Sequence, residues 1–306
     1  MIYTLTTNPA VDMMITTDAL QPNTVMRTQN TVYAPQGKGV NVSLTLRHFG
    51  VENTALGFFG GFTGEYIVNS CRERGVAVKP IWVEDMTRIN VVVNGGGQEY
   101  NLVNAGPVVP REKQEELLAL LNTASDMEVL CISGSLPRGI EPSYYEEILR
   151  VCESRGISVV LDISSPKLKE LLAFRPLLIK PNDDELFSVF GLRCESEEEI
   201  LAALAELHRL GAQNVLLTLG ARGAYFSNGT AVYRCGVYPV QVCSTVCAGD
   251  ATLGGFLSGW LADKMAVEAA LRLGAACGAS AAENADLGDF RHVPVYRELI
   301  PVTRVK

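Results

Sequence analysis

The chain of 306 residues is 47% hydrophobic and 20% charged, which is typical of a folded globular protein and excludes wholesale disorder. Its formal charge of −8 argues against nucleic acid or an anionic membrane as the main partner, because both require a basic surface. A single core stops growing at about 250 to 300 residues, so we expect one main domain with a small appendage.

The N-terminus and the cysteines favour a cytoplasmic protein. The first residues have no basic segment and read as a strand, so no signal peptide is indicated, and no apolar run is long enough to span a bilayer. The eight cysteines are scattered, often among apolar neighbours, as is usual for buried thiols in a reducing compartment. Cys243 and Cys247 have a spacing that also suits a metal or redox site, but the chain has only three histidines and no second cysteine pair near them.

The first predicted strand ends at Asn8 and is soon followed by Asp12. A carboxylate just past a strand often binds a ligand in α/β folds, although it can equally cap a turn. A helix to about His48 opens with Gly37, Lys38 and Gly39. Two glycines let a ligand approach the backbone while the ammonium reaches a negative charge; a glycine turn with an exposed lysine is the alternative.

A first βα unit, at 54–59 and 63–74, leads to three β-like runs joined by tight turns, at 76–83, 87–93 and 99–103. Alternating, half-polar strands predict an antiparallel sheet that is covered on one face only. We therefore assign residues 76–105, together with the irregular segment 13–34, to a small β-sheet lid. Arg88 in this lid has the planar donors that suit a phosphate, with a solvated surface charge as the alternative.

After Pro110 the helical and strand patterns alternate, which predicts an α/β fold with a mainly parallel sheet. The expected helices are 111–122, 142–155, 166–173, 250–263 and 266–283, with a core-facing helical pattern at 198–207, and the expected strands are 128–133, 157–162 and 177–179. Polar residues follow these strands directly: Ser133 to Ser135, Asp162, Lys180 with Asn182 and Glu185, and Thr218 to Gly223. Ligands of open α/β sheets bind beyond the carboxyl ends of the strands, so we predict a cleft at this edge.

The stretch from Ser244 ends in Ala248, Gly249 and Asp250, where a helix is expected to begin. Backbone amides at a helix start point outward and carry partial positive charge, so they can receive a phosphate while Asp250 acts as a base. An acidic residue that is simply favoured in the first helical turn is the alternative.

Across nearly the full length, the ordered motifs of this chain resemble those of the ribokinase-like carbohydrate kinases, also called the PfkB family. They are Asn8-Pro9-Ala10-Val11-Asp12, Gly37-Lys38-Gly39-x-Asn41, Thr87-Arg88-Ile89-Asn90-Val91, Ser133-Gly134-Ser135-Leu136-Pro137, Lys180-Pro181-Asn182-x-x-Glu185, Leu219-Gly220-Ala221-x-Gly223-Ala224 and Ala248-Gly249-Asp250. The 1-phosphofructokinase and tagatose-6-phosphate kinase branch is the most similar. The resemblance implies one ribokinase-like domain over residues 1–306, with three α/β/α layers and the lid.

The resemblance also implies a role for each matched residue. The catalytic centre would contain Asp250 as the general base, with Gly249, Ala248 and Cys247. The sugar phosphate would contact Asp12, Gly37, Lys38, Gly39, Asn41, Arg88, Asn104 and Ser133, with Lys38 and Arg88 on its phosphate. ATP would contact Lys180, Asn182, Thr218, Gly220, Gly223 and Gly249, and Glu185 would act on Mg²⁺ through water. The lid would close over the sugar and pair two subunits as a homodimer.

Two positions depart from the family pattern, which usually has glycine where this chain has Gln36 and Cys247. A side chain costs about 1 kcal/mol or more wherever the backbone needs a positive φ, so we expect an effect on efficiency more than on chemistry.

The resulting hypothesis is an ATP-dependent kinase of a ketohexose monophosphate, with fructose 1-phosphate as the expected substrate and its 6-hydroxyl as the acceptor. Tagatose 6-phosphate and fructose 6-phosphate are alternatives on the same fold. A different class, a sensor or scaffold that binds sugar phosphate or nucleotide without turnover, is disfavoured because Asp250, Lys38 and Arg88 are all present.

Overall fold

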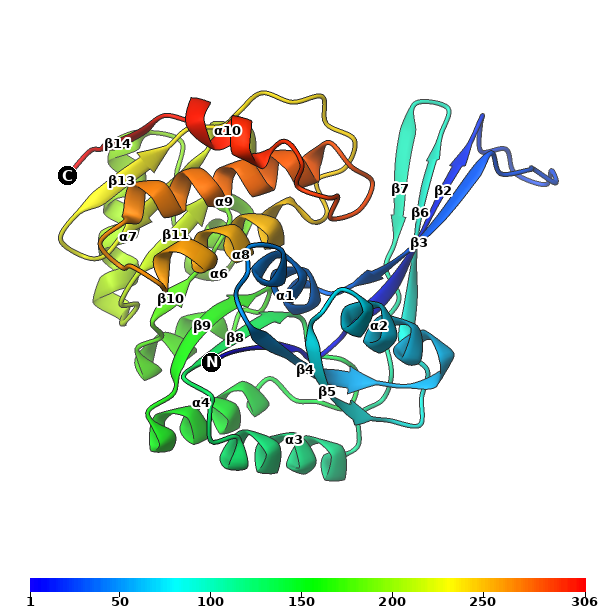
Figure 1. Cartoon of the computed structure of the whole chain (residues 1–306), viewed down its shortest axis with the longest axis horizontal. Helices are drawn as coiled ribbons and strands as arrows, with labels where there is room; N and C mark the ends of the chain where they lie inside the picture. The colour runs from blue at the N-terminus through cyan, green and yellow to red at the C-terminus, as the bar shows by residue number, and fades with distance from the viewer.

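The computed structural model describes all 306 residues and contains one large and one small sheet (Figure 1). The large sheet has ten strands in the order β14-β13-β12-β11-β10-β9-β8-β1-β4-β5. Their bounds are β1 Ile2–Thr6, β4 Asn53–Phe59, β5 Ala77–Trp82, β8 Val129–Gly134, β9 Ser158–Ile163, β10 Leu178–Ile179, β11 Val215–Thr218, β12 Ala224–Ser227, β13 Val232–Cys235 and β14 Val302–Arg304.

The strands from β5 through to β11 run parallel, which confirms the expected sheet. Antiparallel β12, β13 and β14 extend it at one edge. The order reverses at β1, which lies between β8 and β4, and every residue of β1 is buried. Such a reversal is the place where open α/β sheets form a ligand crevice.

Helices cover both faces of the large sheet. One face carries α3 (Arg111–Thr123), α4 (Tyr144–Arg155), α5 (Leu168–Leu171), α6 (Asp183–Phe190) and α7 (Glu197–Leu210); the other carries α1 (Lys38–His48), α2 (Gly61–Glu73), α8 (Ala248–Trp260), α9 (Val267–Ala282) and α10 (Val293–Leu299). Each face has its own core, of 39 and 37 buried residues. Successive strand residues point to opposite faces, so Tyr3 and Leu5 join the first core and Ile2 the second. The expected α/β/α layers are therefore confirmed.

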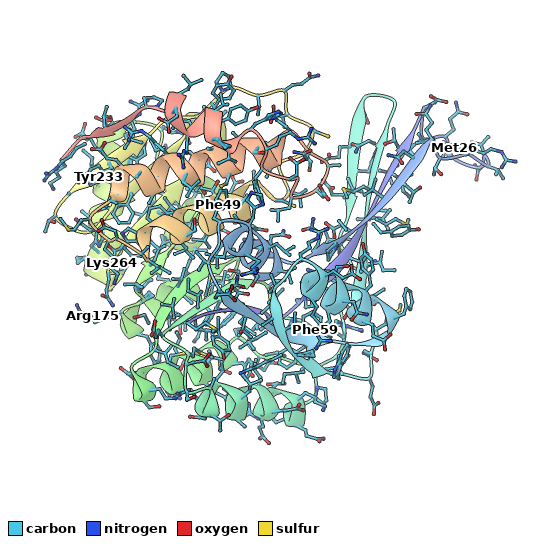
Figure 2. All side chains as sticks on the ribbon, in the orientation of Figure 1. Met26, Phe49, Phe59, Arg175, Tyr233 and Lys264 are labelled. Atoms are coloured by element: carbon cyan, nitrogen blue, oxygen red, sulfur yellow. The ribbon has the colours of Figure 1, made fainter.

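The four-stranded lid sheet has the order β3-β2-β6-β7. Its strands are β2 (Ala10–Thr17), β3 (Asn30–Gln36), β6 (Arg88–Gly95) and β7 (Gln98–Leu102). The lid sheet projects from the main body, with Met26 at its far tip while Phe59 lies within the body (Figures 1 and 2). It is not wholly antiparallel, because β2 and β6 run parallel.

The predicted extent of the lid was wrong for residues 77–82. This segment forms β5, which pairs in parallel with β4 at the edge of the large sheet. An edge strand is covered less than a central one, so its side chains alternate in exposure just as those of a lid strand do. The local pattern could not distinguish the two sheets.

Two short helices, α6 and α10, were not predicted, and 166–173 is a single α-turn of α5 followed by a 3₁₀ turn, Leu172–Phe174. The helix expected from residue 250 begins two residues earlier, so Asp250 lies within the first turn of α8. No helix is long and apolar enough to cross a membrane.

Candidate active site

The predicted sheet edge brings Asp162 and Lys180 together at the ends of β9 and β10. Lys180 Nζ lies 3.2 Å from Asp162 Oδ1, and both side chains are buried. Burial alone would raise the pKa of the Asp162 carboxyl, but the ammonium groups of Lys180 and Lys38 hold that pKa below its ordinary value. The carboxylate of Asp162 therefore carries its negative charge inside the protein.

Lys38 joins this cluster from the first turn of α1. Its Nζ lies 3.5 Å from Asp162 Oδ1 and 3.5 Å from Glu185 Oε1, and it donates a hydrogen bond of 3.0 Å to Ser164 Oγ. Ser164 Oγ in turn donates to Glu185 Oε1 at 2.7 Å. The nearby Asp162 charge raises the pKa of Lys38 against the opposing effect of burial, so the lysine stays protonated.

From the sequence we expected Lys38 beside Arg88 on one phosphate, and this stays a prediction. The expected pairing with Arg88 on one phosphate has no shared contact in the structure, because the lysine side chain runs over Gly134 of β8 toward β9. Lys38 thus lies among the residues that were expected on the nucleotide and metal side. The physical reason is the carboxylate pair, Asp162 and Glu185, which attracts the ammonium group.

Gly37 and Gly39 fit tightly against the end of β1. Gly37 has φ 138°, and a Cβ atom there would lie 2.6 Å from Thr6 Cγ2. A Cβ atom on Gly39 would lie 2.5 Å from Thr6 Oγ1. Both positions therefore require glycine for α1 to begin beside β1, and this start carries Lys38 and Asn41 into the site.

Asp250 is buried at the head of α8, opposite Asn41 of α1. Asn41 Nδ2 donates a hydrogen bond of 2.8 Å to Asp250 Oδ2. Burial, together with the Asp162 charge, raises the pKa of Asp250 to about 7, although Asn41, Lys38 and Lys180 oppose this shift. A carboxylate with a pKa near neutrality is suited to act as a general base.

The backbone at the start of α8 offers donors beside this carboxylate. The amides of Gly249 and Asp250 have no hydrogen-bond acceptor, whereas the amide of Ala248 donates to the carbonyl of Thr245 at 3.2 Å. The structure therefore leaves two of the three expected anion-binding amides free. A Cβ atom on Gly249 would lie 3.6 Å from Lys180 Nζ, so a cation adjoins these amides.

The lid sheet supplies a second polar group around Asp12 of β2. Asn90 Nδ2 of β6 donates to Asp12 Oδ1 at 2.9 Å. Arg88 donates to the carbonyls of Asn104, at 2.8 Å, and Asn8, at 3.0 Å. Burial raises the pKa of Asp12, partly offset by Asn90 and Arg88. The two motifs that were expected at the sugar thus meet at the base of the lid sheet.

The remaining predicted residues lie at the carboxyl ends of β8, β10 and β11 in the large sheet. Asn182 caps α6 and forms a β-bridge with Thr218, whose amide donates to the carbonyl of Pro181. Gly220 and Gly223 bound the turn that follows β11. Ser133 of β8 is buried and pairs with Asp162 of β9 in the sheet register. Its hydroxyl lies 3.5 Å from Cys131 Sγ and makes no hydrogen bond to the other predicted residues.

The donor set at Asp162 and Glu185 fits Mg²⁺. Neither oxygen of the buried Asp162 carboxylate has a hydrogen-bond donor in good geometry, although both lysines lie close. Both carboxylates contact the same ammonium group, so they lie near one another. Mg²⁺ prefers oxygen ligands and is usually held by one or two carboxylates together with substrate phosphates.

Sequence reasoning placed Asp162 at the predicted cleft without a specific role and did not single out Ser164 or Asn90, although each lies within these clusters. The signal that placed Asp162 at the cleft was a carboxylate at the end of an apolar strand. The cysteine pair separates into different surroundings, since Cys243 is exposed whereas Cys247 is buried against Gln36.

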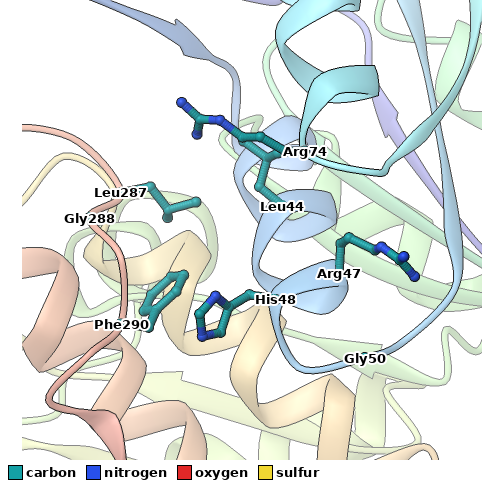
Figure 3. Close-up of a pocket in the computed structure, with 8 residues that line it drawn as sticks. All are labelled: Leu44, Arg47, His48, Gly50, Arg74, Leu287, Gly288 and Phe290. Carbon is teal, nitrogen blue, oxygen red and sulfur yellow. The ribbon is translucent and has the colours of Figure 1, made fainter.

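A surface pocket of about 350 Å³ lies at the C-terminal end of α1, where Arg47 and His48 are among the residues that line it (Figure 3). With 11 residues, α1 is about 16 Å long, so this pocket is remote from Lys38. Arg47 and Arg74 point in different directions, and Arg47 is paired with Glu52. The two arginine side chains therefore do not converge on one ligand position in this pocket.

Comparison with known proteins identifies the family of the chain. A model of the pfkB family of carbohydrate kinases matches residues 5–290. D-tagatose-1-phosphate kinase of Klebsiella oxytoca is 46% identical over 305 residues, and 1-phosphofructokinase of Bacillus subtilis is 33% identical over 305 residues; each alignment covers 100% of both chains. The crystal structure of Escherichia coli phosphofructokinase-2 with substrates and products superimposes with a TM-score of 0.89 at 29% identity, covering 97% of this chain and 98% of the other.

A parallel sheet with a lid, and a buried carboxylate at a helix start, define a phosphotransferase of the ribokinase-like fold. The chain belongs to the pfkB family of carbohydrate kinases.

Proposed function

We propose that the protein transfers the γ-phosphoryl group of ATP to the 6-hydroxyl of a ketohexose 1-phosphate. The observation that carries this proposal is Asp250, a buried carboxylate with a raised pKa beside two unpaired amides and Lys180. Phosphoryl transfer requires a base, anion donors and a cation around one point, so this combination supports the proposal.

In the proposed reaction, the sugar hydroxyl oxygen attacks the γ-phosphorus while its proton passes to Asp250. The new oxygen–phosphorus bond forms as the bond to the β-phosphate oxygen breaks, and ADP leaves. The amides of Gly249 and Asp250, with Lys180, stabilise the charge on the transferring group. Asn182, Thr218, Gly220 and Gly223 line the nucleotide side.

Lys38 is proposed here as a phosphoryl-binding residue rather than a ligand of the phosphate already on the sugar. Its contacts to Asp162 and Glu185 support this change. Those two carboxylates would hold Mg²⁺, which when bound neutralises phosphate charge. Arg88 remains the proposed contact of the sugar's own phosphate, with Asn104 beside it.

The remaining sugar contacts are proposed from the lid sheet and α1. Asp12, held by Asn90, and Asn41 would bind hydroxyl groups, with Gly37 and Gly39 allowing the sugar to approach the backbone. Ser133 makes no polar contact with this group, and its contact with the sugar stays a prediction.

D-tagatose 1-phosphate is the substrate that similarity favours. The relatives described as D-tagatose-1-phosphate kinases, from K. oxytoca and Bacillus licheniformis, are 46% and 38% identical to this chain, against 33% for the B. subtilis 1-phosphofructokinase. Fructose 1-phosphate, the substrate expected from sequence motifs, is the second candidate. The two sugars differ only in the configuration at C4.

A coupled assay of ADP release tests the proposal with four sugars: tagatose 1-phosphate, fructose 1-phosphate, tagatose 6-phosphate and fructose 6-phosphate. The expected order of kcat/KM places the two 1-phosphates first and tagatose 1-phosphate highest. Turnover of the 6-phosphates alone would reject the proposed substrate class. Asp250→Asn is expected to lose at least about a hundredfold in kcat, given the usual size of general-base effects.

We also propose that two copies pair through the lid sheet. Tyr33, Tyr100 and Leu102 on this sheet are exposed, and apolar side chains gathered on one small sheet favour association. Light scattering after size exclusion tests this: a dimer that becomes a monomer in Tyr33→Glu supports it, and a wild-type monomer at micromolar concentration rejects it.

A further inference from the structure

Gln36 and Cys247, the two positions where the resemblance to the family led us to expect glycine, touch each other. Gln36 ends β3 and Cys247 precedes α8, so they are 211 positions apart in the chain. Gln36 Nε2 donates to Cys247 Sγ at 3.1 Å, and the thiol lies 3.4 Å from Gln36 Oε1. Both side chains are buried. Two changes that look independent in sequence therefore form one contact.

Neither side chain strains the backbone. Cys247 has φ −94° and ψ −6°, in the right-handed helical region, and Gln36 lies in a strand and is not among the residues with positive φ. The expected cost of replacing glycine is thus absent at both positions. The pair adds polar contacts in a place where two glycines would leave none.

The contact extends to the proposed base through Asn41. An amide NH₂ group has two hydrogens, and Asn41 Nδ2 uses them on Gln36 Oε1, at 2.7 Å, and on Asp250 Oδ2, at 2.8 Å. If the Asn41 amide were turned over, its oxygen would face both of these acceptors. Cys247 Sγ lies within reach of both ends of the Gln36 amide, and Asn41 Nδ2 lies 3.7 Å from the same sulfur. The direction of the Gln36 amide therefore follows from the hydrogen bond that its Oε1 accepts from Asn41.

We propose that Gln36, held by Cys247, is a positioning residue that locks the Asn41 amide with its NH₂ group toward Asp250. The inference rests on the proposed role of Asp250 as the general base. Asn41 is the only hydrogen-bond donor to the Asp250 side chain, so its direction decides whether the carboxylate is stabilised or repelled. Cys247 contacts both residues of this pair, since its Sγ accepts from Gln36 Nε2 and lies 3.7 Å from Asn41 Nδ2.

The charged groups that face Asp250 are Lys38 from α1, Lys180 after β10 and Asp162 of β9, and the Cys247 thiol precedes it on the chain. Replacing Gln36 removes none of these charged groups, and only the neutral Cys247 thiol loses a partner. Burial beside Asp250 raises the pKa of the Cys247 thiol, so the thiol stays neutral across the working pH range. A change in the titration of Asp250 in a Gln36 variant would therefore report the Asn41 hydrogen bond.

The test is a double-mutant cycle of Gln36→Met, Cys247→Ala and the double variant, with kcat/KM for the sugar measured against pH. Gln36→Met keeps the volume but removes both polar atoms. We expect it to lower kcat by roughly fivefold to tenfold, the size of one lost hydrogen bond, and to move the acid limb of kcat/KM to higher pH. The KM for ATP is expected to stay within about twofold, because Gln36 contacts no residue of the proposed nucleotide side.

Cys247→Ala is expected to have a smaller effect in the same direction, and the double variant to fall short of the sum of the two single effects, because the thiol contacts both Gln36 and Asn41. Cys247→Ser, which keeps a polar partner for Gln36 Nε2, is expected to restore the wild-type acid limb. If Gln36→Met folds poorly, Gln36→Ala removes the amide without added bulk and is expected to move the limb in the same way.

An acid limb that stays in place in the Gln36 variants, or additive effects in the cycle, would overturn the inference. A merely structural role would lower the unfolding temperature without moving the limb. Asp250→Asn separates this failure from failure of the proposed function: an active Asp250→Asn protein rejects the base itself, whereas an inactive one with an unmoved limb in Gln36→Met rejects only the positioning role.

Discussion

Asn41 and Asp250 are 209 positions apart in the chain, yet Asn41 Nδ2 donates a hydrogen bond of 2.8 Å to Asp250 Oδ2. The contact joins the start of α1, which lies beside the end of β1, to the start of α8. This hydrogen bond opposes the rise in the pKa of Asp250 that burial causes, so it helps to determine the pH at which the carboxylate can accept a proton.

The first prediction concerns the pH dependence of turnover. Burial raises the pKa of Asp250 to about 7, and a general base works only when deprotonated, so kcat/KM is expected to rise as pH increases through about 7. The measurement is kcat/KM for the sugar phosphate between pH 5 and 9. The substrate's own second ionisation, at about 6, gives a separate and lower limb. A profile that is flat between pH 6.5 and 8 would contradict the assigned base.

The same raised pKa predicts that Asp250 costs stability at alkaline pH. The folded protein keeps this proton up to about 7, whereas the unfolded chain loses it near the ordinary value of 3.8. Between these values the folded state binds more protons, so the contribution to stability falls as pH rises and stays low above 7. Asp250→Asn is therefore expected to raise the unfolding temperature at pH 8 relative to wild type, and to do so much less at pH 5. Equal shifts at both pH values would argue against a buried, protonatable carboxyl.

Lys180→Met tests the buried ion pair with Asp162. Removing one partner leaves a buried carboxylate, which typically costs about 3 to 5 kcal/mol, and the lower end is expected because Lys38 still lies 3.5 Å from Asp162. Urea unfolding measures the change. The matched control is Lys113→Met, an exposed ion pair with Glu116, which is expected to leave the midpoint unchanged. Similar results for the two variants would mean that the buried pair is unimportant.

Glu185→Gln tests the proposed metal side. The concentration of Mg²⁺ that gives half the maximal rate is expected to rise at least about tenfold, because a charged oxygen ligand becomes neutral. Glu185 also closes a capping box with Asn182, and glutamine preserves that geometry. Glu199→Gln, in the equivalent capping box with Ser196 on α7, is the control and is expected to keep the wild-type Mg²⁺ dependence. An unchanged Mg²⁺ requirement in Glu185→Gln would remove this residue from the metal site.

Gly37→Ala tests the tight start of α1. The new Cβ atom would meet Thr6 Cγ2 at 2.6 Å at a φ of 138°, so we expect a loss of more than about 2 kcal/mol and a large drop in activity as α1 shifts. Gly97→Ala has a positive φ of 76° but open space around the Cβ atom, and is expected to cost only about 1 kcal/mol with full activity. Equal losses would show that backbone conformation, not the contact with Thr6, is what matters at residue 37.

Much of the fold and of the site could be predicted from the sequence. Alternating helical and strand patterns gave the parallel sheet, because side-chain periodicity depends only on local geometry. The polar residues that follow the strands predicted the edge where Asp162, Lys180 and Glu185 meet, since the ends of parallel strands share one edge. Asp250 at a helix start was likewise readable from its neighbours.

Other features were decided only by tertiary structure. Strand β5 looks like a lid strand in its own pattern, and only its pairing with β4 assigns it to the large sheet. The partners of Lys38 depend on how α1 sits across β8 and β9, which no local signal encodes. At Gln36 and Cys247 the sequence showed two unusual side chains, whereas the fold joins them into one contact beside Asp250. The sequence by itself thus determined the elements and the chemistry available at their ends; packing between distant segments determined which of those groups meet, because a contact across 211 positions depends on the whole core and on no local pattern.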